Sequence, residues 1–224
     1  NETFSDQKRD SILKLHDHFS ERMALAPASA KEHFHNAFPG GYVVHILNVI
    51  TNAKVLFNVW KEAGATINFT EEELVFSALF HDLGKVGNLT DDFYIPNSSE
   101  WHRKNQGKIY EFNSKLQYMQ VTDRSFMLLN HFNIQITQNE FLGIRLADGM
   151  YEEHNKAYLS GYDDNFRLKT NLPHILHQSD MISACSEYDA WKKSNTEDDS
   201  SKVDAKKDKL IQTKKTLAET LEQS

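Results

Sequence analysis

The sequence has one cysteine, four prolines, nine glycines and no apolar run long enough to span a bilayer. A single thiol, Cys185, cannot form an intrachain disulfide and cannot build a Cys-based zinc site, which fits a reducing compartment. No signal-peptide pattern is present, so we expect a cytoplasmic protein without a membrane partner. The scarcity of helix-breaking residues leaves room for long helices.

An excess of positive charge is also missing. The formal net charge is −7, whereas surfaces that bind nucleic acid generically are basic. Long nucleic acid is therefore not an expected partner, although a locally positive pocket for one phosphate is compatible with this balance. The 224 residues suffice for one well-buried core and are few for two domains.

Hydrophobic periodicity predicts several helices. The predicted helices cover residues 5–25, 42–63, 71–81, 125–132, 137–146 and 172–191. Two of them begin with a capping box, in which Thr70 and Thr137 are each followed three residues later by glutamate. Residues 86–113 mix glycine, proline and aromatics, and this pattern predicts a loop with a short hairpin.

The composition changes near residue 193. Residues 1–192 are predicted to form a single domain, and residues 193–224 a charged linker followed by a helix at Ala205–Leu221 or a disordered tail. We interpret this tail as a solvated helix or a disordered end. The alternative is an oligomerisation helix, which would make the protein a homo-oligomer.

The most informative motif is the pair His81-Asp82 at the end of an apolar helix. Imidazole and carboxylate are ligands of hydrolytic transition-metal sites. His45 upstream and Asp180 downstream are each a polar group in an apolar helix, and a buried carboxylate needs a partner. Taken alone, each residue is better explained by a structural role, His45 as a core histidine bonded to a carbonyl and Asp180 as an aspartate paired with a lysine or arginine. Taken together with the His-Asp pair, they favour a metal site.

This ordered set resembles the HD-domain metal-dependent phosphohydrolase superfamily, in particular HD nucleotide hydrolases and the HD domains of exoribonuclease-type proteins. The segments around the first and last of these residues, 34–45 and 176–184, are similar too, and the resemblance covers residues 32–191. It implies an enzyme with the all-α HD-domain fold and a short hairpin insertion after the His-Asp pair. It also implies one divalent ion (Mn, Fe, Co, Ni or Zn), held by His45, His81, Asp82 and Asp180.

Roles near the ion follow from the same resemblance. Asp82 orients the metal-bound water, and Lys85 neutralises a phosphate oxygen unless it is a solvated cation at a helix end. His35, in the loop before the paired glycines, is a candidate general acid. Ala147 occupies a position where related proteins carry a histidine, so a second metal is not expected; a compensating ligand from His131 is the alternative.

Substrate-binding residues are predicted in two further segments. Residues 101–110 combine aromatic and cationic side chains, which predicts phosphate binding by Arg103 and Lys104 and stacking by Tyr110. An exposed hairpin without a binding role is the alternative. Asp148, before a glycine, either faces a ribose hydroxyl or base edge or only forms the turn.

The combined prediction is a metal-dependent phosphohydrolase that cleaves a phosphomonoester or phosphodiester of a small nucleotide with a metal-activated water. A cyclic-nucleotide or oligonucleotide phosphodiesterase, or an exonuclease-like enzyme, is the enzymatic alternative. A module that binds a nucleotide with little or no turnover, and a purely structural interaction protein, are the alternatives from other classes.

Overall fold

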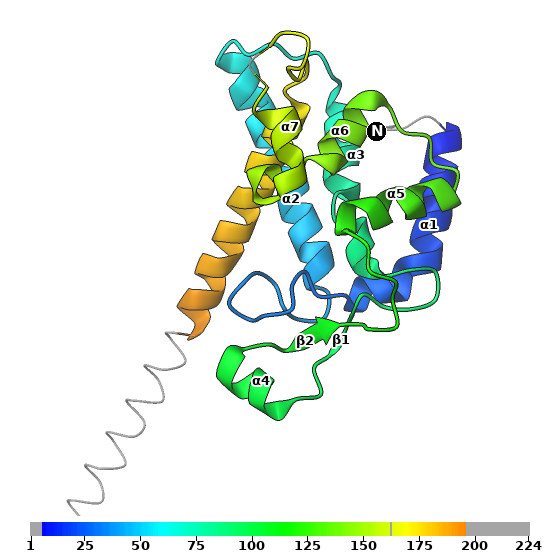
Figure 1. Cartoon of the computed structure of the whole chain (residues 1–224), viewed down its shortest axis with the longest axis vertical. Helices are drawn as coiled ribbons and strands as arrows, with labels where there is room; N and C mark the ends of the chain where they lie inside the picture. Colours follow the sequence, from blue (N-terminus) through cyan, green and yellow to red (C-terminus); the bar gives the residue numbers. More distant parts are fainter. Residues whose placement is uncertain (1–5, 162, 196–224) are drawn as a thin grey trace, which may run out of the picture.

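The computed structural model describes residues 6–161 and 163–195, and within them the predicted all-α fold is confirmed (Figure 1). The long helices are α1 (Asp6–Leu25), α2 (Gly41–Glu62), α3 (Glu71–Phe80), α5 (Val121–His131), α6 (Gln138–Arg145) and helix 172–195. Two short helices, α4 (Glu100–Gln106) and α7 (Lys156–Leu159), accompany them. Three 3-10 turns complete the set: η1 (Leu83–Val86), η2 (Gly149–Tyr151) and η3 (Glu153–Asn155). The predicted helix at Ala205–Leu221 lies outside the described residues.

Both predicted capping boxes are present, and they are joined to each other. The Thr70 hydroxyl accepts from the Glu73 amide at 3.1 Å, and the Glu73 carboxylate accepts from the Thr70 amide at 2.9 Å. The Thr137 hydroxyl caps α6 in the same way and donates to Glu73 Oε1 at 2.6 Å. This bond fixes the start of α6 against the start of α3.

Helix α3 lies between two apolar clusters and is buried along most of its length. One cluster joins it to α1, η1 and α5 through residues such as Phe19, Phe76 and Leu128. The other joins it to α2 and helix 172–195 through residues such as Val49, Leu74 and Ile175. Because a helix that is apolar on all sides must be enclosed, the sequence of α3 places its C-terminal end inside the protein. His81 immediately follows that end.

Helices α2 and 172–195 run antiparallel and are joined by polar contacts. Trp60 Nε1 donates to Gln178 at 3.1 Å, and Asn52 Nδ2 donates to Ser183 at 2.8 Å. Near the other end of the pair, Asn48 Nδ2 donates to Glu187 at 2.7 Å. A row of polar side chains between two apolar helices fixes their relative register.

Helix α2 is the one helix in the described part of the chain that is long and apolar enough to cross a membrane, although the sequence predicts no such run. This is weak evidence for a membrane segment, because the core helix of a soluble protein has the same length and composition. In this structure α2 turns His45, Asn48 and Asn52 toward helix 172–195.

The predicted hairpin follows η1 and is formed by β1 (Tyr94–Pro96) and β2 (Tyr110–Phe112), which pair antiparallel. The sequence prediction missed α4, which fills the connection between the two strands. Ser99 begins α4 by accepting from the His102 amide at 3.4 Å, and Gly107 ends it with a φ of 57°. We call residues 94–112 the hairpin insertion; it lies at the lower end of the view in Figure 1.

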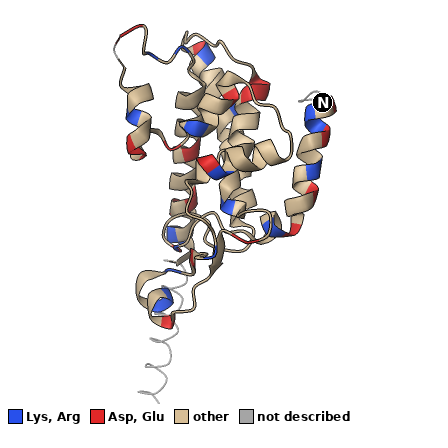
Figure 2. Ribbon diagram, turned by 45° about the vertical axis from the view of Figure 1, so that its right-hand side comes forward, with Lys and Arg blue, Asp and Glu red and all other residues tan. Residues whose placement is uncertain are grey.

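Charged residues of both signs are interspersed along the chain. Figure 2 shows acidic and basic residues alternating along α1 and scattered over the other helices. This distribution agrees with the net charge of −7 and with the absence of a basic excess from the composition.

Candidate metal centre

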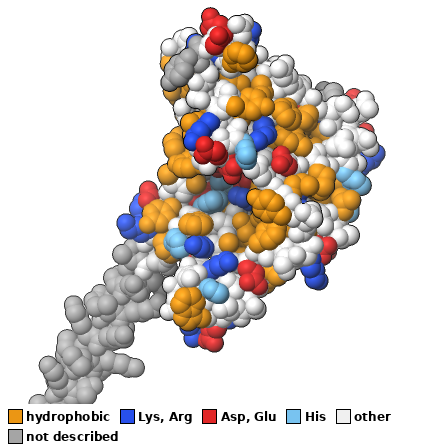
Figure 3. All heavy atoms as spheres, in the orientation of Figure 1, with side chains coloured by type: hydrophobic (Ala, Val, Ile, Leu, Met, Phe, Trp, Pro, Cys, Tyr) orange, Lys and Arg blue, Asp and Glu red, His pale blue; other side chains and the backbone are white. Residues whose placement is uncertain are grey.

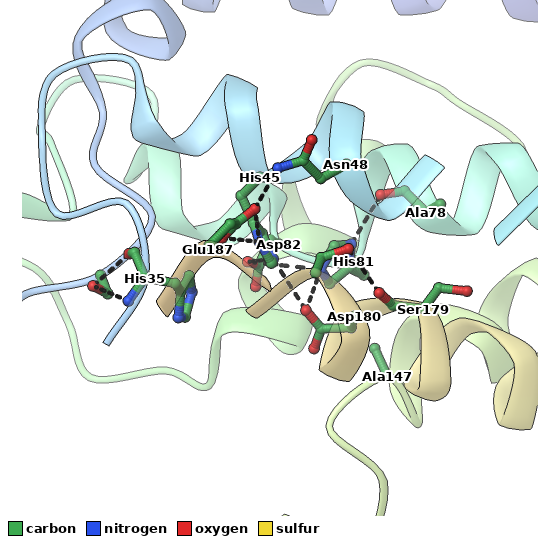
Figure 4. Close-up of polar contacts among 12 residues, drawn as sticks. His35, His45, Asn48, Ala78, His81, Asp82, Ala147, Ser179, Asp180 and Glu187 are labelled. Carbon is green, nitrogen blue, oxygen red and sulfur yellow. Dashed lines mark hydrogen bonds and ion pairs between the residues drawn. The ribbon is translucent and has the colours of Figure 1, made fainter. Parts of the chain in front are cut away.

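Three helical elements bring predicted ligands together (Figure 4). His45 lies in the first turns of α2, His81 follows α3, and Asp180 lies on helix 172–195. Their ligand atoms lie within 4.8 Å of one another, which is close enough for all three to hold one metal ion. Asp180 Oδ1 is 3.0 Å from His45 Nε2 and 3.9 Å from His81 Nε2.

Each imidazole is held through Nδ1, which leaves Nε2 facing the other ligands. His45 Nδ1 donates to the Glu187 carboxylate at 3.1 Å, and His81 Nδ1 donates to the Ala78 carbonyl at 2.9 Å. Both Nε2 atoms are buried: His81 Nε2 has no hydrogen-bond partner among the described residues, and His45 Nε2 contacts the Asp180 carboxylate at 3.0 Å. An unsatisfied buried polar atom costs about 1–3 kcal/mol. A metal ion that accepts both lone pairs removes this cost, so the residues fit a divalent cation.

Asp82 lies beside this group, and a cation already contacts it. Its Oδ2 is 3.7 Å from each of the two Nε2 atoms and 2.6 Å from Lys85 Nζ. Burial raises the pKa of Asp82, but Lys85 and the two imidazoles outweigh burial and hold the pKa well below its usual range. The carboxylate is therefore charged at neutral pH, and its ligand role stays a prediction.

The centre has a negative potential that favours a cation. Burial lowers the pKa of His45, but contacts with Asp180 and Glu187 outweigh it and raise the pKa to about 9. The same carboxylates that hold a proton on this imidazole attract a divalent ion, which competes with the proton for Nε2.

Glu187 is a site residue that the sequence reasoning missed. It is nearly buried on helix 172–195, seven residues after Asp180 and so on the same face of the helix. Its oxygens accept from His45 Nδ1 and from Asn48 Nδ2. A carboxylate behind a ligating histidine fixes its tautomer and orientation. The seven-residue spacing between Asp180 and Glu187 is the sequence signal from which Glu187 could have been found.

His35 packs against the first ligand. Its ring centroid is 4.8 Å from that of His45, and its Nε2 is buried without a partner among the described residues. Burial, together with the charges of Lys85 and His45, lowers the pKa of His35 to about 4. The imidazole is therefore neutral at pH 7, and the predicted general-acid role requires a bound anion that raises its pKa.

Lys85 is buried between two cavities instead of being solvated at a helix end. Its side chain is 15 % exposed, and it lines cavities of about 470 and 450 Å³. Gly84 makes this placement possible, because a Cβ there would lie 2.1 Å from the Val121 carbonyl oxygen of α5. Burial lowers the pKa of Lys85, but Asp82 outweighs burial and keeps the ammonium charged.

The structure does not bring the predicted phosphate ligands of the hairpin insertion to the centre. Arg103 donates to the Asn97 carbonyl, and Lys104 forms an exposed ion pair with Glu100 at 2.6 Å. Neither residue lines the cavity that Asp82 lines. In this geometry neither side chain is placed to contact a phosphate bound in that cavity.

Tyr110 and Asp148 lie on different sides of Lys85. Tyr110 lines the cavity of about 470 Å³, whereas Asp148 lines the cavity of about 450 Å³ together with Asp82 and Lys85. The Asp148 side chain makes no capping hydrogen bond to η2, which favours the substrate-facing interpretation over a turn former. Loss of hydration in the cavity and the nearby Asp82 carboxylate raise the pKa of Asp148.

The segment at Ala147 is held by a histidine that is not a ligand. His177 Nδ1 donates to the Ala147 carbonyl at 2.8 Å, and its ring lies where a Cβ on Gly149 would be, at 2.5 Å. His177 therefore has a structural role at this segment. His131 is exposed at the end of α5 and lies outside the compact ligand group. The expectation of a single metal stays a prediction.

Comparison with family models, with curated proteins and with solved structures finds no match for this chain. The resemblance to HD-domain phosphohydrolases therefore depends on the residues of this sequence and on the way the fold gathers them.

Proposed function

We propose that this protein is a metal-dependent phosphohydrolase of the HD-domain type that acts on a small nucleotide. The observation that carries the proposal is the convergence of two buried imidazole Nε2 atoms, on His45 and His81, on the Asp180 carboxylate, with His81 Nε2 lacking a hydrogen-bond partner in the described residues. Two imidazoles and a carboxylate from separate helices, converging on one point, are a ligand set for a hydrolytic metal.

His45, His81 and Asp180, with Asp82 beside them, would hold one divalent ion. When bound, the ion supplies a water of lowered pKa and polarises a phosphoryl oxygen. Glu187 accepts from Nδ1 of His45 and thereby keeps Nε2 available as a ligand atom. The protein thus contributes a fixed tautomer and a fixed direction for the first ligand.

Lys85 supplies the positive charge for the substrate. Its ammonium is fixed by Asp82 at 2.6 Å and borders the cavity of about 450 Å³. A fixed ammonium offsets negative charge that develops on phosphate oxygens. His35, neutral and packed on His45, is placed to exchange a proton with a group bound beside that ligand.

One observation favours the alternative of a binding module with little turnover. Lys85 Nζ is closer to Asp82 Oδ2 than either imidazole nitrogen is, at 2.6 Å against 3.7 Å. A carboxylate that stays neutralised by an ammonium is a weaker metal ligand, and a centre without it has three protein ligands.

Metal analysis combined with a hydrolysis screen tests the proposal. The chelator-treated protein is reloaded with Mn²⁺, Co²⁺, Ni²⁺ or Mg²⁺ and given nucleoside monophosphates, cyclic nucleotides and short oligonucleotides. Released phosphate is measured for the monophosphates, and chromatography detects the nucleotide products of the two diesters. We expect one ion per chain and hydrolysis that disappears in Asp82→Asn. Nucleotide binding without hydrolysis of any substrate under every metal would favour the binding module, and a chain that binds no ion would contradict both.

A further inference from the structure

Exposed aromatic rings surround the cavity beside the metal centre. The cavity of about 450 Å³ that contains Asp82 and Lys85 is also lined by Phe93, Phe112, Tyr118 and Tyr151. Tyr118 is 78 % exposed and Tyr151 is 83 % exposed. Figure 3 shows hydrophobic side chains bordering a hollow in which acidic, basic and histidine side chains gather. Aromatic walls around a few polar groups are typical of a small-molecule site.

The two tyrosines come from separate segments that one hydrogen bond joins. Gln120, two residues after Tyr118, donates from Nε2 to Glu152 Oε2 at 3.3 Å, and Glu152 directly follows Tyr151. The Tyr151 ring also packs edge-to-face on His177, with centroids 5.9 Å apart. The two segments are therefore joined at the cavity, and the Tyr151 ring is held there by His177, although neither ring is enclosed by the core.

The charges on the cavity wall restrict what can bind between the rings. Asp82, Asp148 and Glu152 are acidic, and Lys85 is the one cation among the lining residues of this cavity. A phosphate is accommodated only near Lys85, where the ammonium lies. Elsewhere the carboxylates accept hydrogen bonds, so they favour a planar ring that carries N–H donors.

We propose that this cavity binds the base of the substrate, with an amino-bearing nucleobase stacked on Tyr118 and Tyr151. The base donates to Glu152, and the phosphate extends toward Lys85 and Asp82. Adenine, guanine and cytosine carry an exocyclic amine with two N–H donors for this wall, whereas uracil offers a single ring N–H. The assignment rests on the proposed function, and it replaces Tyr110, which lines the other cavity, as the stacking residue.

Nucleosides test the base site without any catalysis, because they carry no phosphate to hydrolyse. Saturation-transfer difference NMR with adenosine, cytidine, uridine and ribose, in separate titrations, reports direct contact of each probe with the protein. We expect binding of adenosine and cytidine, weaker binding of uridine and none of ribose. The double variant Tyr118→Ala/Tyr151→Ala should lose at least about tenfold in affinity, because stacking is worth about 1–3 kcal/mol per base.

Two controls separate stacking from folding. Tyr118→Phe/Tyr151→Phe keeps both rings and should bind as the wild type does. Tyr158→Ala removes a partly exposed tyrosine of α7 that does not line this cavity, and it should change nothing. Wild-type protein that binds no nucleoside, ribose that binds as well as cytidine, or an alanine double variant with unchanged affinity would each overturn the base site.

Phosphate release, measured separately on the monophosphates and on ribose 5-phosphate, distinguishes this inference from the proposed function. A protein that binds nucleosides through the two tyrosines and releases no phosphate keeps the base site and refutes the hydrolase. Hydrolysis of ribose 5-phosphate as fast as that of the nucleotides, unchanged in the alanine double variant, refutes the base site and keeps the hydrolase.

Discussion

The metal centre and the hairpin insertion are both rich in polar side chains, and they use them in opposite ways. At the centre, His45 and His81 each donate a hydrogen bond from one ring nitrogen and direct the other, which is buried, at the Asp180 carboxylate. In the insertion, Arg103 and Lys104 are engaged with Asn97 and Glu100 of the same segment. The metal centre therefore has buried ring nitrogens that can still bind a ligand. The cations of the insertion already contact protein groups at the surface.

This difference shows which polar residues indicate a site. A polar group that a helix forces into the core costs free energy unless it has a partner, so an unpaired one points to a missing ligand. A cation on an exposed turn costs nothing to solvate, and its presence beside aromatic residues carries little information. The predictions below test this contrast between the two regions, from the largest expected effect to the smallest.

Replacing a ligand of the centre should have the largest effect. His81→Ala removes a nitrogen that no other described group can replace, so bound metal should fall from about one ion per chain to near zero. Phosphate release should fall by at least about a hundredfold, because a catalytic metal contributes several kcal/mol. Elemental analysis and a phosphate assay measure both quantities. The matched variant His102→Ala, in the insertion, should retain metal and activity. A loss of metal and activity in His102→Ala as large as that in His81→Ala would contradict the difference between the two regions.

Replacing the carboxylate behind His45 should weaken the metal without abolishing it. Glu187→Gln removes the charge that orients the imidazole, and such changes lower metal affinity by about 10- to 100-fold. A competition titration with a chromogenic chelator measures this affinity. Glu153→Gln, at an exposed ion pair with Lys156, is the control and should leave affinity unchanged. Unchanged affinity in Glu187→Gln would mean that Glu187 has only a packing role.

Acid should destabilise the metal-free protein because it protonates His35 beside the metal centre, and His102 in the insertion should not contribute. The pKa of His35 falls from 6.5 to about 4 on folding, so between these values the unfolded chain binds more protons. Stability is therefore lost as the pH falls from 6.5 to 4, by on the order of 2–3 kcal/mol. Urea unfolding across this range should show a smaller pH dependence in His35→Asn than in the wild type. His102→Asn is the control. If the free energy of unfolding of His35→Asn depends on pH as strongly as that of the wild type, the effect is not due to His35.

Removing the cations of the insertion should have the smallest effect on function. Arg103→Ala and Lys104→Ala should each change the KM for a nucleotide by less than about twofold, because neither side chain reaches the cavity at Asp82. Arg103→Ala should lower the free energy of unfolding by about 1 kcal/mol through its lost hydrogen bond. Lys104→Ala should change it by less than about 0.5 kcal/mol. A tenfold rise in KM for either variant would restore the phosphate role predicted from the sequence.

The sequence predicted what depends on local pattern. The capping boxes at Thr70 and Thr137 fix two helix starts through neighbouring residues, and both are present. His45, His81 and Asp180 were recognisable because each is a polar group in an apolar helix, and the core then forces them together.

The sequence could not predict what depends on contacts between distant segments. The direction of Arg103 is set by the Asn97 carbonyl within the unpredicted turn that leads into α4. Tyr118 and Tyr151 line one cavity because their segments meet, and the bond from Gln120 to Glu152, which lie 32 residues apart, joins these segments. Glu187 was accessible from its spacing to Asp180, but only once the partner helix α2 was known to lie alongside.

The central claim is that two imidazoles and two carboxylates, from α2, the end of α3 and helix 172–195, bind one divalent ion. A crystal grown with Mn²⁺, with diffraction recorded on both sides of the manganese absorption edge, tests it directly. We predict one anomalous peak about 2.0–2.3 Å from Nε2 of His45, Nε2 of His81 and a carboxylate oxygen of Asp180, with Asp82 beside it. A map without a peak at this position, or with the two Nε2 atoms bonded to protein groups, would contradict the claim.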